Sequence, residues 1–412
     1  MELHEILAEA VRNDASDILL KVGVPPAFRV RADFLPLEGA QSLDAATVNR
    51  MVDGLVDDMR RGRLEAEMQV DLAYDDAELG RFRVNIFRQR GFLSLVIRVI
   101  PSRIRSVAEL NLPPVIERLA TERRGLILVT GTTGSGKSTT LAAMLDQINK
   151  TRTAHVVTIE DPIEFLFTNQ KSSIVQREIG VDTASFSVAL RAALRQDPDV
   201  IMVGEMRDME TIDIALKAAE TGHLVLSTAH TTDAAKTIQR ILSVFPSAEQ
   251  NMVRIRLAEC LRAVISQRLL PRVDGSGQIP AVETMIVTRL IQDCIRDPER
   301  NYEINEFISK GRNYGMQTFD HALLRMLRHG LIAREVAISA ATSPGDLDLQ
   351  LRMGLDEDEL AIEGHRQSSY HEVPLSYGLA SAEERVDEDA KDLEVAQAKP
   401  KPPTAAPGPP RS

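Results

Sequence analysis

A short glycine-rich segment constrains the fold of this chain more than any other feature. It reads Gly131-Thr-Thr-Gly-Ser-Gly-Lys137-Ser138, which is the P-loop pattern G-x-x-x-x-G-K-[ST] in full. The apolar run 126–130 before it predicts a buried strand, and residues 139–148 after it predict a helix. This strand–loop–helix order favours a phosphate-binding loop in an α/β domain over a chance turn rich in glycine and serine.

The backbone and the side chains of this loop carry separate parts of phosphate binding. Backbone N–H groups of the glycine turn and the positive end of the following helix face a phosphate. We expect Lys137 to reach the β- and γ-phosphates and the Ser138 hydroxyl to help hold Mg²⁺. The segment therefore predicts ATP and Mg²⁺ as cofactors. The predicted nucleotide-binding residues are Gly131, Thr132, Thr133, Gly134, Ser135, Gly136, Lys137, Ser138 and Thr139.

Composition narrows the class of protein in which this loop works. With 412 residues, 43% of them hydrophobic, the chain is long enough for two or three domains with cores of their own. It has no apolar run of about 18 residues and it begins with a polar, acidic segment, so neither a membrane span nor a secretory signal is predicted. Its two cysteines, Cys260 and Cys294, stand apart, which predicts core positions rather than a zinc ribbon or disulfides and favours the cytoplasm.

The negative charge of the chain is concentrated towards the C-terminus. Residues 346–412 hold 15 acidic and 7 basic side chains, which accounts for −8 of the formal net charge of −11. The remaining body is close to neutral and the chain has no tryptophan, so a basic nucleic-acid surface and a base-stacking platform are both unexpected. Nucleic acid is therefore not a predicted partner.

Hydrophobic periodicity divides the chain into five parts. Residues 1–100 predict a small α+β domain, and residues 101–114 a linker. Residues 115–286 alternate strands and helices, as in a parallel sheet covered by helices. Residues 287–353 predict a helical subregion. Residues 354–412, acidic and then proline-rich, predict a disordered tail, or a segment that folds on a partner.

The same periodicities give bounds for individual elements. Strands are expected at 17–21, 27–31, 66–74, 81–88 and 91–100 in the first domain, and at 126–130, 155–160, 200–204, 223–228 and 279–286 in the second. Helices are expected at 3–12, 44–56, 139–148, 186–195, 209–220, 234–242, 289–296, 319–328 and 333–341. Residues 248–269 predict one further long helix.

Acidic residues follow two of the expected strands of the α/β domain. The first group is Glu160, Asp161 and Glu164, at the end of the strand 155–160, where a doubly wound sheet places its site. Hydrolysis of a nucleoside triphosphate needs a carboxylate to orient or deprotonate water. For Asp161 alone, a helix cap before proline is the alternative. The second is Glu205, after the apolar run 200–203, a Walker-B pattern suited to Mg²⁺ coordination through water.

Histidines flank a third expected strand. His223 precedes the run 224–228 and His230 follows it. A histidine at a strand end usually makes structural hydrogen bonds, and that is the alternative for both. Thr228 and His230 stand where a γ-phosphate sensor would be. We find no third ligand at metal spacing, so a zinc site is not predicted.

These motifs together resemble the ATPases of type II secretion and type IV pili. Residues 160–165 match the Asp box of that family, 200–208 its Walker B and 222–232 its His box, in the same order after the P-loop. The resemblance is greatest to the pilus-retraction branch, the PilT and PilU type, and covers residues 1–354. Segments similar to that branch are Gln176-Arg-Glu-Ile179, Ala263-Val-Ile-Ser-Gln267 and Gly315-Met-Gln-Thr-Phe319-Asp320.

The resemblance implies a fold and a set of roles. It implies a RecA-like ATPase domain preceded by a PAS-like α+β domain, assembled as a homo-hexameric ring. It implies that Glu164 is the general base, that Glu205 supports Mg²⁺ and the attacking water, and that His230 lies near the γ-phosphate. It further implies that ATP-coupled closure of the N-terminal over the C-terminal domain drives pilus retraction, and with it twitching motility.

Arginines of the N-terminal domain reach the phosphates in this family. Arg83, Arg88 and Arg98 are the candidates, because each lies on the strand pair that would face the nucleotide, and Arg98 is preferred. The alternative is that they are solvated strand arginines, since exposed strand faces commonly carry charge.

The chain departs from the family pattern at three positions. Leu19 stands where the family has histidine in Ser-Asp-Leu-His-Leu, and Thr132 stands where proline is common in the P-loop. Gln292 replaces the first arginine of a C-terminal signature that is implicated in retraction, which tilts the resemblance towards a PilU-like or divergent paralogue.

Two other functions are the alternatives to a main retraction motor: an accessory ring subunit that hydrolyses little, which is of another class, and a different ATPase of the same superfamily. One is a PilU-like accessory ATPase that acts with a partner motor, a paralogous retraction ATPase. The other is a pilus-extension or type II secretion ATPase, which is less expected because the chain begins at the small domain and lacks a four-cysteine zinc insert. The implied partner is the platform protein of the pilus, and the implied location is the cytoplasmic side of the inner membrane at the pilus base. A small-molecule kinase and a DNA-packaging motor are remote alternatives.

Overall fold

The N-terminal part of the chain is a six-stranded sheet with three helices. The computed structural model describes residues 1–30, 33–100 and 103–353. The strand order is β3-β2-β1-β6-β5-β4, and all of the pairings between these strands are antiparallel. The strands are β1 (Asp17–Lys21), β2 (Ala27–Val30), β3 (Asp33–Pro36), β4 (Gln69–Asp76), β5 (Gly80–Gln89) and β6 (Phe92–Val99). The helices are α1 (Leu3–Arg12), α2 (Ala45–Asp53) and α3 (Asp58–Glu67).

The core of this part follows from the period of each element. In α1, Ile6, Leu7 and Ala10 lie on one helical face and are buried, while alternate residues of β5, such as Phe82 and Val84, point into the same cluster. The prediction of a small α+β domain is confirmed.

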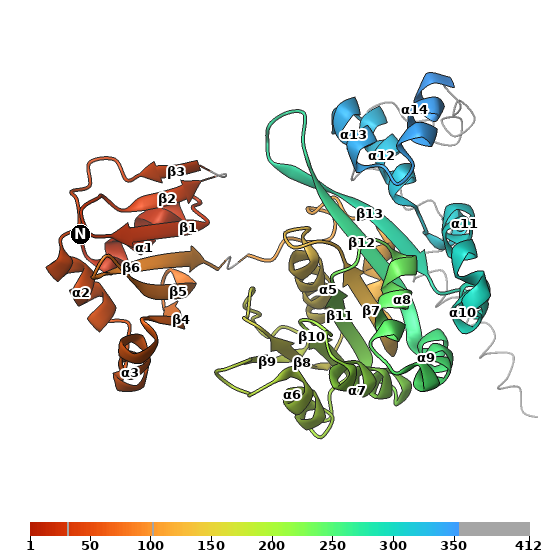
Figure 1. Ribbon diagram of the computed structural model, residues 1–412, viewed down its shortest axis with the longest axis horizontal. Coiled ribbons are helices and arrows are strands. Elements are labelled where there is room, and N and C mark those ends of the chain that lie inside the picture. The colour runs from red at the N-terminus through yellow and green to blue at the C-terminus, as the bar shows by residue number, and fades with distance from the viewer. Residues whose placement is uncertain (31–32, 101–102, 354–412) are drawn as a thin grey trace, which may run out of the picture. The chain divides into compact units, whose positions relative to one another are not determined.

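The second part is built on a seven-stranded sheet in the order β13-β12-β7-β11-β10-β8-β9 (Figure 1). Every neighbouring pair is parallel except β12 with β13, which form an antiparallel hairpin at one edge. The strands are β7 (Gly125–Thr130), β8 (His155–Glu160), β9 (Ser173–Glu178), β10 (Val200–Val203), β11 (Leu224–Ala229), β12 (Leu261–Pro271) and β13 (Gln278–Ile286).

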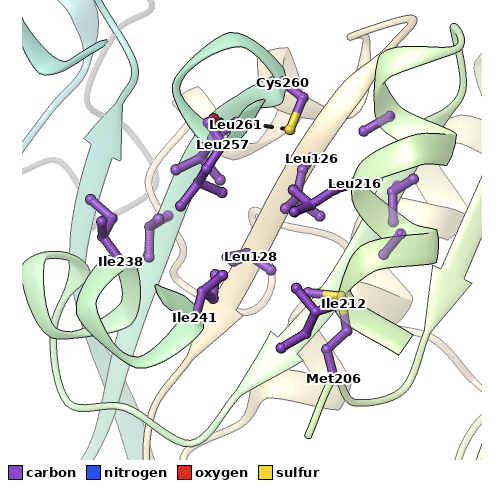
Figure 2. Packing of buried hydrophobic residues seen from close by; sticks show 14 of the residues in the cluster. Leu126, Leu128, Met206, Ile212, Leu216, Ile238, Ile241, Leu257, Cys260 and Leu261 are labelled. Atoms are coloured by element: carbon purple, nitrogen blue, oxygen red, sulfur yellow. Dashed lines mark hydrogen bonds between the residues drawn. The ribbon is translucent and has the colours of Figure 1, made fainter. Parts of the chain in front are cut away.

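Helices cover both faces of this sheet, which is the arrangement that the alternation of strands and helices predicts. Residues of β7 alternate between two buried layers. Leu126 and Leu128 pack with α7 (Met209–Glu220), α8 (Ala234–Ser243) and α9 (Ser247–Cys260), as Figure 2 shows. Ile127 and Val129 pack on the other side with α4 (Val115–Ala120) and α5 (Lys137–Thr151). The remaining helix of this part is α6 (Phe186–Ala193).

Short helices follow the sheet towards the C-terminus. They are α10 (Arg289–Arg296), α11 (Ile304–Lys310), α12 (Phe319–Arg328), α13 (Arg334–Ala340) and α14 (Pro344–Met353), with 3₁₀ turns at Pro298–Glu303 and Arg312–Tyr314. The predicted helical subregion is therefore confirmed. The predicted tail, residues 354–412, lies outside the described residues.

The prediction of one long helix at 248–269 is wrong, because only its first part is helical. The chain leaves the helical conformation after Cys260 and continues as β12, which pairs with β7 on one side and with β13 on the other. Leu261, Val264 and Ile265 fit an apolar helical face as well as a buried strand, so the period could not separate the two. The pairing with β7, far away in sequence, decides it.

The cysteines are core residues, as predicted. Cys260 and Cys294 are both buried and unpaired. Burial raises the pKa of Cys260 to about 12, so its thiol stays protonated and unreactive. Over the described ranges, no helix is both long and apolar enough to cross a bilayer.

Candidate functional site

The P-loop connects the centre of the sheet to α5, as predicted. β7 ends at Thr130, and α5 begins at Lys137 with Gly136 in a left-handed conformation, φ +88°, in front of it. The Nζ of Lys137 donates to the carbonyl oxygens of Gly131 and Thr132, at 3.0 and 2.9 Å. Lys137 is therefore held within the curve of the loop, where a phosphate contacts a P-loop lysine.

Gly131 and Gly125 allow β12 to approach both ends of β7. Both have positive φ, +146° and +112°. A β-carbon on Gly131 would lie 2.5 Å from the carbonyl oxygen of Gln267, and one on Gly125 would lie 2.7 Å from that of Cys260. Neither carbonyl can yield as a flexible side chain would, because both belong to the backbone.

Gly131→Ala should therefore disrupt the loop. We expect a loss of more than about 1 kcal/mol in the free energy of unfolding, together with weaker ADP binding, because the added methyl overlaps backbone and strains φ. Denaturant titration and calorimetry measure the two. Gly62→Ala is the matched control: Gly62 lies inside α3 with open space around it, so alanine there should be neutral or stabilising by up to about 1 kcal/mol. Equal effects of the two substitutions would contradict the steric argument.

The fold brings the acidic candidates to Lys137. Burial lowers the pKa of Lys137, and the carboxylates of Glu164 and Glu205 act against that change by favouring the charged ammonium. Glu164 follows β8 and Glu205 follows β10, two neighbouring strands of the parallel sheet. Their carboxyl ends meet at the edge that carries the P-loop.

Glu205 also meets the histidine of the next strand. Its Oε2 lies 2.7 Å from Nη2 of Arg207 and 3.7 Å from Nε2 of His230. The pKa of His230 is lowered, first by burial and then by the positive charges of Lys137 and Arg207. His230 is therefore a neutral imidazole at pH 7, able to donate or accept one hydrogen bond without carrying charge.

His223, which precedes β11, and Thr228, within it, both make structural hydrogen bonds. Nδ1 of His223 lies 2.9 Å from the carbonyl oxygen of Ala218, at the end of α7. The Thr228 hydroxyl is buried and donates to the carbonyl oxygen of Gly204 at 2.6 Å, which ties β11 to the segment after β10. For His223, the alternative of a histidine that makes structural hydrogen bonds is therefore the one that fits.

The segment after β8 is a loop. Asp161 is exposed and no helix follows it, so the helix-cap alternative for this residue is wrong. Glu160 is buried, and burial raises its pKa; its Oε1 accepts hydrogen bonds from Thr158 Oγ1 at 2.6 Å and Gln176 Nε2 at 3.1 Å. Glu164, by contrast, is exposed at the site. Within this box, the carboxylate of Glu160 is therefore buried, whereas those of Asp161 and Glu164 are exposed.

Arg98 pairs within the N-terminal domain. Its Nε donates to Oδ1 of Asp17 at 2.9 Å, while its side chain is 64% exposed. Arg83 lies opposite Arg98 on β5, with Asp71 3.9 Å away. The Arg98 side chain is thus paired with a carboxylate but still largely exposed to solvent, which is compatible with its predicted role.

Several residues of the site carry no recognisable motif. Gln267 on β12 is buried, and its Nε2 donates to Thr140 Oγ1 on α5 at 2.8 Å. Thr130 Oγ1, next to the P-loop, donates to Ser266 Oγ at 3.1 Å. Asn149 and Gln176 hold the loop after β8. Of these six residues, only Gln176, Ser266 and Gln267 lie in the segments that resemble the retraction branch.

The available oxygens fit Mg²⁺. Ser138 supplies a hydroxyl at the start of α5, and Glu205 supplies a carboxylate; both are hard ligands. In the part of the chain that the structure describes, no three His, Cys, Asp or Glu side chains gather as a metal site. In nucleotide sites Mg²⁺ binds through few protein ligands together with phosphate oxygens and water.

Known proteins share this fold and this site. The sequence model of the family described as Type II/IV secretion system protein matches residues 1–317. The chain is 45% identical over 344 residues to the type IV pilus retraction ATPase PilT of Pseudomonas aeruginosa, covering 84% of this chain and 99% of that protein. It is 38% identical over 358 residues to the type IV pilus ATPase PilU of the same organism, covering 87% and 93%.

A solved structure agrees with these relatives. The crystal structure of the pilus retraction motor PilT with bound ADP superposes with a TM-score of 0.78 at 43% identity, covering 85% of this chain and 99% of that one. The predicted fold class, a RecA-like ATPase domain preceded by a small α+β domain, is confirmed.

Proposed function

Because the chain belongs to the Type II/IV secretion system protein family, we propose that it is the ATP-hydrolysing motor of type IV pilus retraction. The chain is an ATPase that binds a nucleotide at the P-loop. The observation that carries the proposal is the convergence of Lys137, Glu164, Glu205 and His230 at one edge of the sheet, in a chain that spans 99% of PilT.

Each residue of this set has a role in the proposed reaction. Lys137 and the P-loop backbone hold the β- and γ-phosphates. Glu164 is the general base that takes a proton from the attacking water, and its exposure on the site side leaves it accessible to that water. His230, neutral at pH 7, contacts the γ-phosphate as a hydrogen-bond partner. Ser138 and Glu205 would hold Mg²⁺, which supplies a positive charge to the phosphate oxygens.

We further propose that six copies form a ring and that Arg98 completes the site from the N-terminal domain. A guanidinium that reaches a phosphate when the domains close would make hydrolysis depend on their arrangement. The proposed domain boundaries are 1–100, 101–114 as linker, 115–286 and 287–353, with the tail at 354–412. The proposed partner is the inner-membrane platform protein of the pilus, and the proposed location is the cytoplasmic face of that membrane.

An accessory, PilU-like role is the second candidate. Gln292 favours it, because an arginine is expected at this position of the retraction signature. The higher identity to PilT, 45% against 38%, supports the main motor instead.

Lys137→Ala tests the nucleotide site. We expect it to lower ATP affinity and turnover by at least about a hundred-fold, because the lysine is the charged group within the loop. Lys150→Ala, in the same helix but about half exposed and paired with Asp146, should leave both unchanged. Turnover is measured as phosphate release, and the mass of the assembly by light scattering. A hexamer with equal activity in both variants would rule out the P-loop as the working site.

Surface motility tests the biological function. The wild-type chain, placed in a twitching bacterium that lacks its own retraction ATPase, should restore movement, and Lys137→Ala should not. Restoration only when a second retraction ATPase is present would establish the accessory role. An active monomer that never assembles would rule out the ring mechanism.

A further inference from the structure

The backbone of the loop that carries Glu164 forms few hydrogen bonds with other backbone groups. This loop, residues 161–172, connects β8 to β9 without helix or strand. Backbone N–H and C=O groups near a protein interior need hydrogen bonds, so a loop of this kind keeps one conformation only if side chains supply them. The fixed conformation matters because a general base has to be held at a set distance from water and phosphate.

Gln176 supplies these hydrogen bonds from the neighbouring strand. Its Nε2 donates to the carbonyl oxygen of Phe165 at 2.8 Å, and its Oε1 accepts from the backbone N–H of Phe167 at 3.0 Å. The two bonded residues lie one and three positions after Glu164. This amide on β9 therefore holds the backbone after Glu164, while Oε2 of Glu178, on the same strand, accepts from the N–H of Ile163 before it at 3.4 Å.

The orientation of this amide is fixed by a third contact. Nε2 of Gln176 also donates to Oε1 of the buried Glu160, at 3.1 Å, and that oxygen accepts from Thr158 Oγ1 as well. Both hydrogens of the NH₂ group are therefore used, and the carbonyl is turned towards Phe167. A carboxylate at this position could make only the contact with Phe167, because it has no hydrogen to donate.

The far end of the loop is attached to the P-loop helix. Asn149 is buried on α5; its Nδ2 donates to the Thr168 carbonyl oxygen at 2.9 Å, and its Oδ1 accepts from the Gln170 N–H at 3.0 Å. α5 begins with Lys137. The loop is thus held between β9 and the helix that carries the phosphate-binding lysine.

From these contacts we propose that Gln176 is a positioning residue for ATP hydrolysis, which holds the backbone around Glu164 in the conformation in which that carboxylate reaches the attacking water. The inference rests on the proposed role of Glu164 as the base. Because the contacts of Gln176 are with the loop backbone and with Glu160, its loss should act on the chemical step and leave binding in place.

Gln176→Met keeps the length of the side chain and removes all three hydrogen bonds. We expect kcat to fall at least about ten-fold, with KM for ATP and the Kd for ADP within about two-fold of wild type. Gln170→Met is the matched control, because Gln170 is an exposed glutamine of the same loop that contributes its backbone N–H to Asn149; its kcat should equal that of wild type. The kcat of Gln176→Glu, a substitution of the same size, should fall as much as that of Gln176→Met. This variant is measured instead if the methionine variant does not fold.

The double variant with Glu164→Gln separates the two proposals. If Gln176 acts through Glu164, Gln176→Met should change the residual turnover of Glu164→Gln by less than about two-fold, because the group that it positions is already inactive. An undiminished effect in that background, a wild-type kcat in Gln176→Met, or a fall in ADP affinity equal to the fall in kcat would each overturn the inference. Full activity of Glu164→Gln alone would instead overturn the role of Glu164.

Discussion

Glu164→Gln should lower ATP turnover by about a hundred- to ten-thousand-fold while the protein still binds nucleotide and assembles. The amide has nearly the size of the carboxylate but cannot take a proton, and removal of a general base costs rates of this order. Glu164 is exposed, so the substitution leaves the core intact. Phosphate release at saturating ATP measures the turnover, and calorimetry with ADP measures the binding.

Glu249→Gln is the matched control for this experiment. Glu249 is an exposed residue in the first turn of α9 and is not one of the residues assigned to the nucleotide site. Its substitution should leave turnover unchanged. If Glu164→Gln retained turnover within about three-fold of wild type, another group would have to activate the water. Glu205, which also lies at Lys137, would then be the next residue to substitute.

Glu283→Gln should make the protein more stable than wild type at high pH. Glu283 is a buried carboxyl on β13, and burial raises its pKa to about 7. Its Oε1 accepts hydrogen bonds from the N–H of Ala234, at the start of α8, at 2.8 Å and from Ser266 Oγ at 3.3 Å. The glutamine oxygen can accept both, so the substitution removes the titration and keeps the contacts.

The raised pKa of Glu283 determines how stability changes with pH. The folded-state pKa of Glu283 lies above the ordinary value of 4.5, so its contribution to stability is fully present below that value and is lost as the pH rises through about 7. The loss amounts to about 3 kcal/mol in the free energy of unfolding. Asp233 adds to the upward shift by repulsion, and Arg268 on β12 opposes it.

Denaturant titrations between about pH 5 and pH 8 measure this loss. The free energy of unfolding of Glu283→Gln, relative to wild type, should rise by up to about 3 kcal/mol across that range. Glu249→Gln, at an exposed position, should keep a constant difference from wild type. A constant difference for Glu283→Gln as well would mean that the carboxyl titrates alike in the folded and unfolded chain.

The sequence predicts best where one local pattern is sufficient. The P-loop, with its glycines, Lys137 and Ser138, is defined by eight consecutive residues, and the structure has the expected strand and helix on its two sides. Glu164, Glu205 and His230 each follow an apolar run, and the topology of a parallel sheet then brings the three strand ends together. Their placement therefore needs a fold class and no detailed packing. Their proposed roles stay predictions.

Edge and surface elements were missed because their sequences are polar. β9, Ser173–Glu178, is the edge strand next to β8 among the described residues and has one buried residue, so it shows no apolar alternation. α3, Asp58–Glu67, buries only Leu64. Elements of this kind exist because of what they pack against, which a window of sequence does not contain.

The supporting residues of the site escaped for a related reason. Asn149 is one polar residue in the middle of a helix, and Gln176 is one polar residue on an edge strand. What they do depends on the loop that the fold brings to them. Glu283 was likewise invisible, since a glutamate in an expected strand is ordinarily assigned to the solvent side.

The close approach of β12 to both ends of β7 has a mechanical consequence. At Gly125 and Gly131 there is no space for a side chain between the two backbones. We therefore expect β7 and β12 to move together as one rigid pair of strands. β12 continues through its hairpin into β13, and β13 runs within a few residues of α10. A displacement of β7 would therefore have a continuous main-chain route through β12 and β13 to the C-terminal helices.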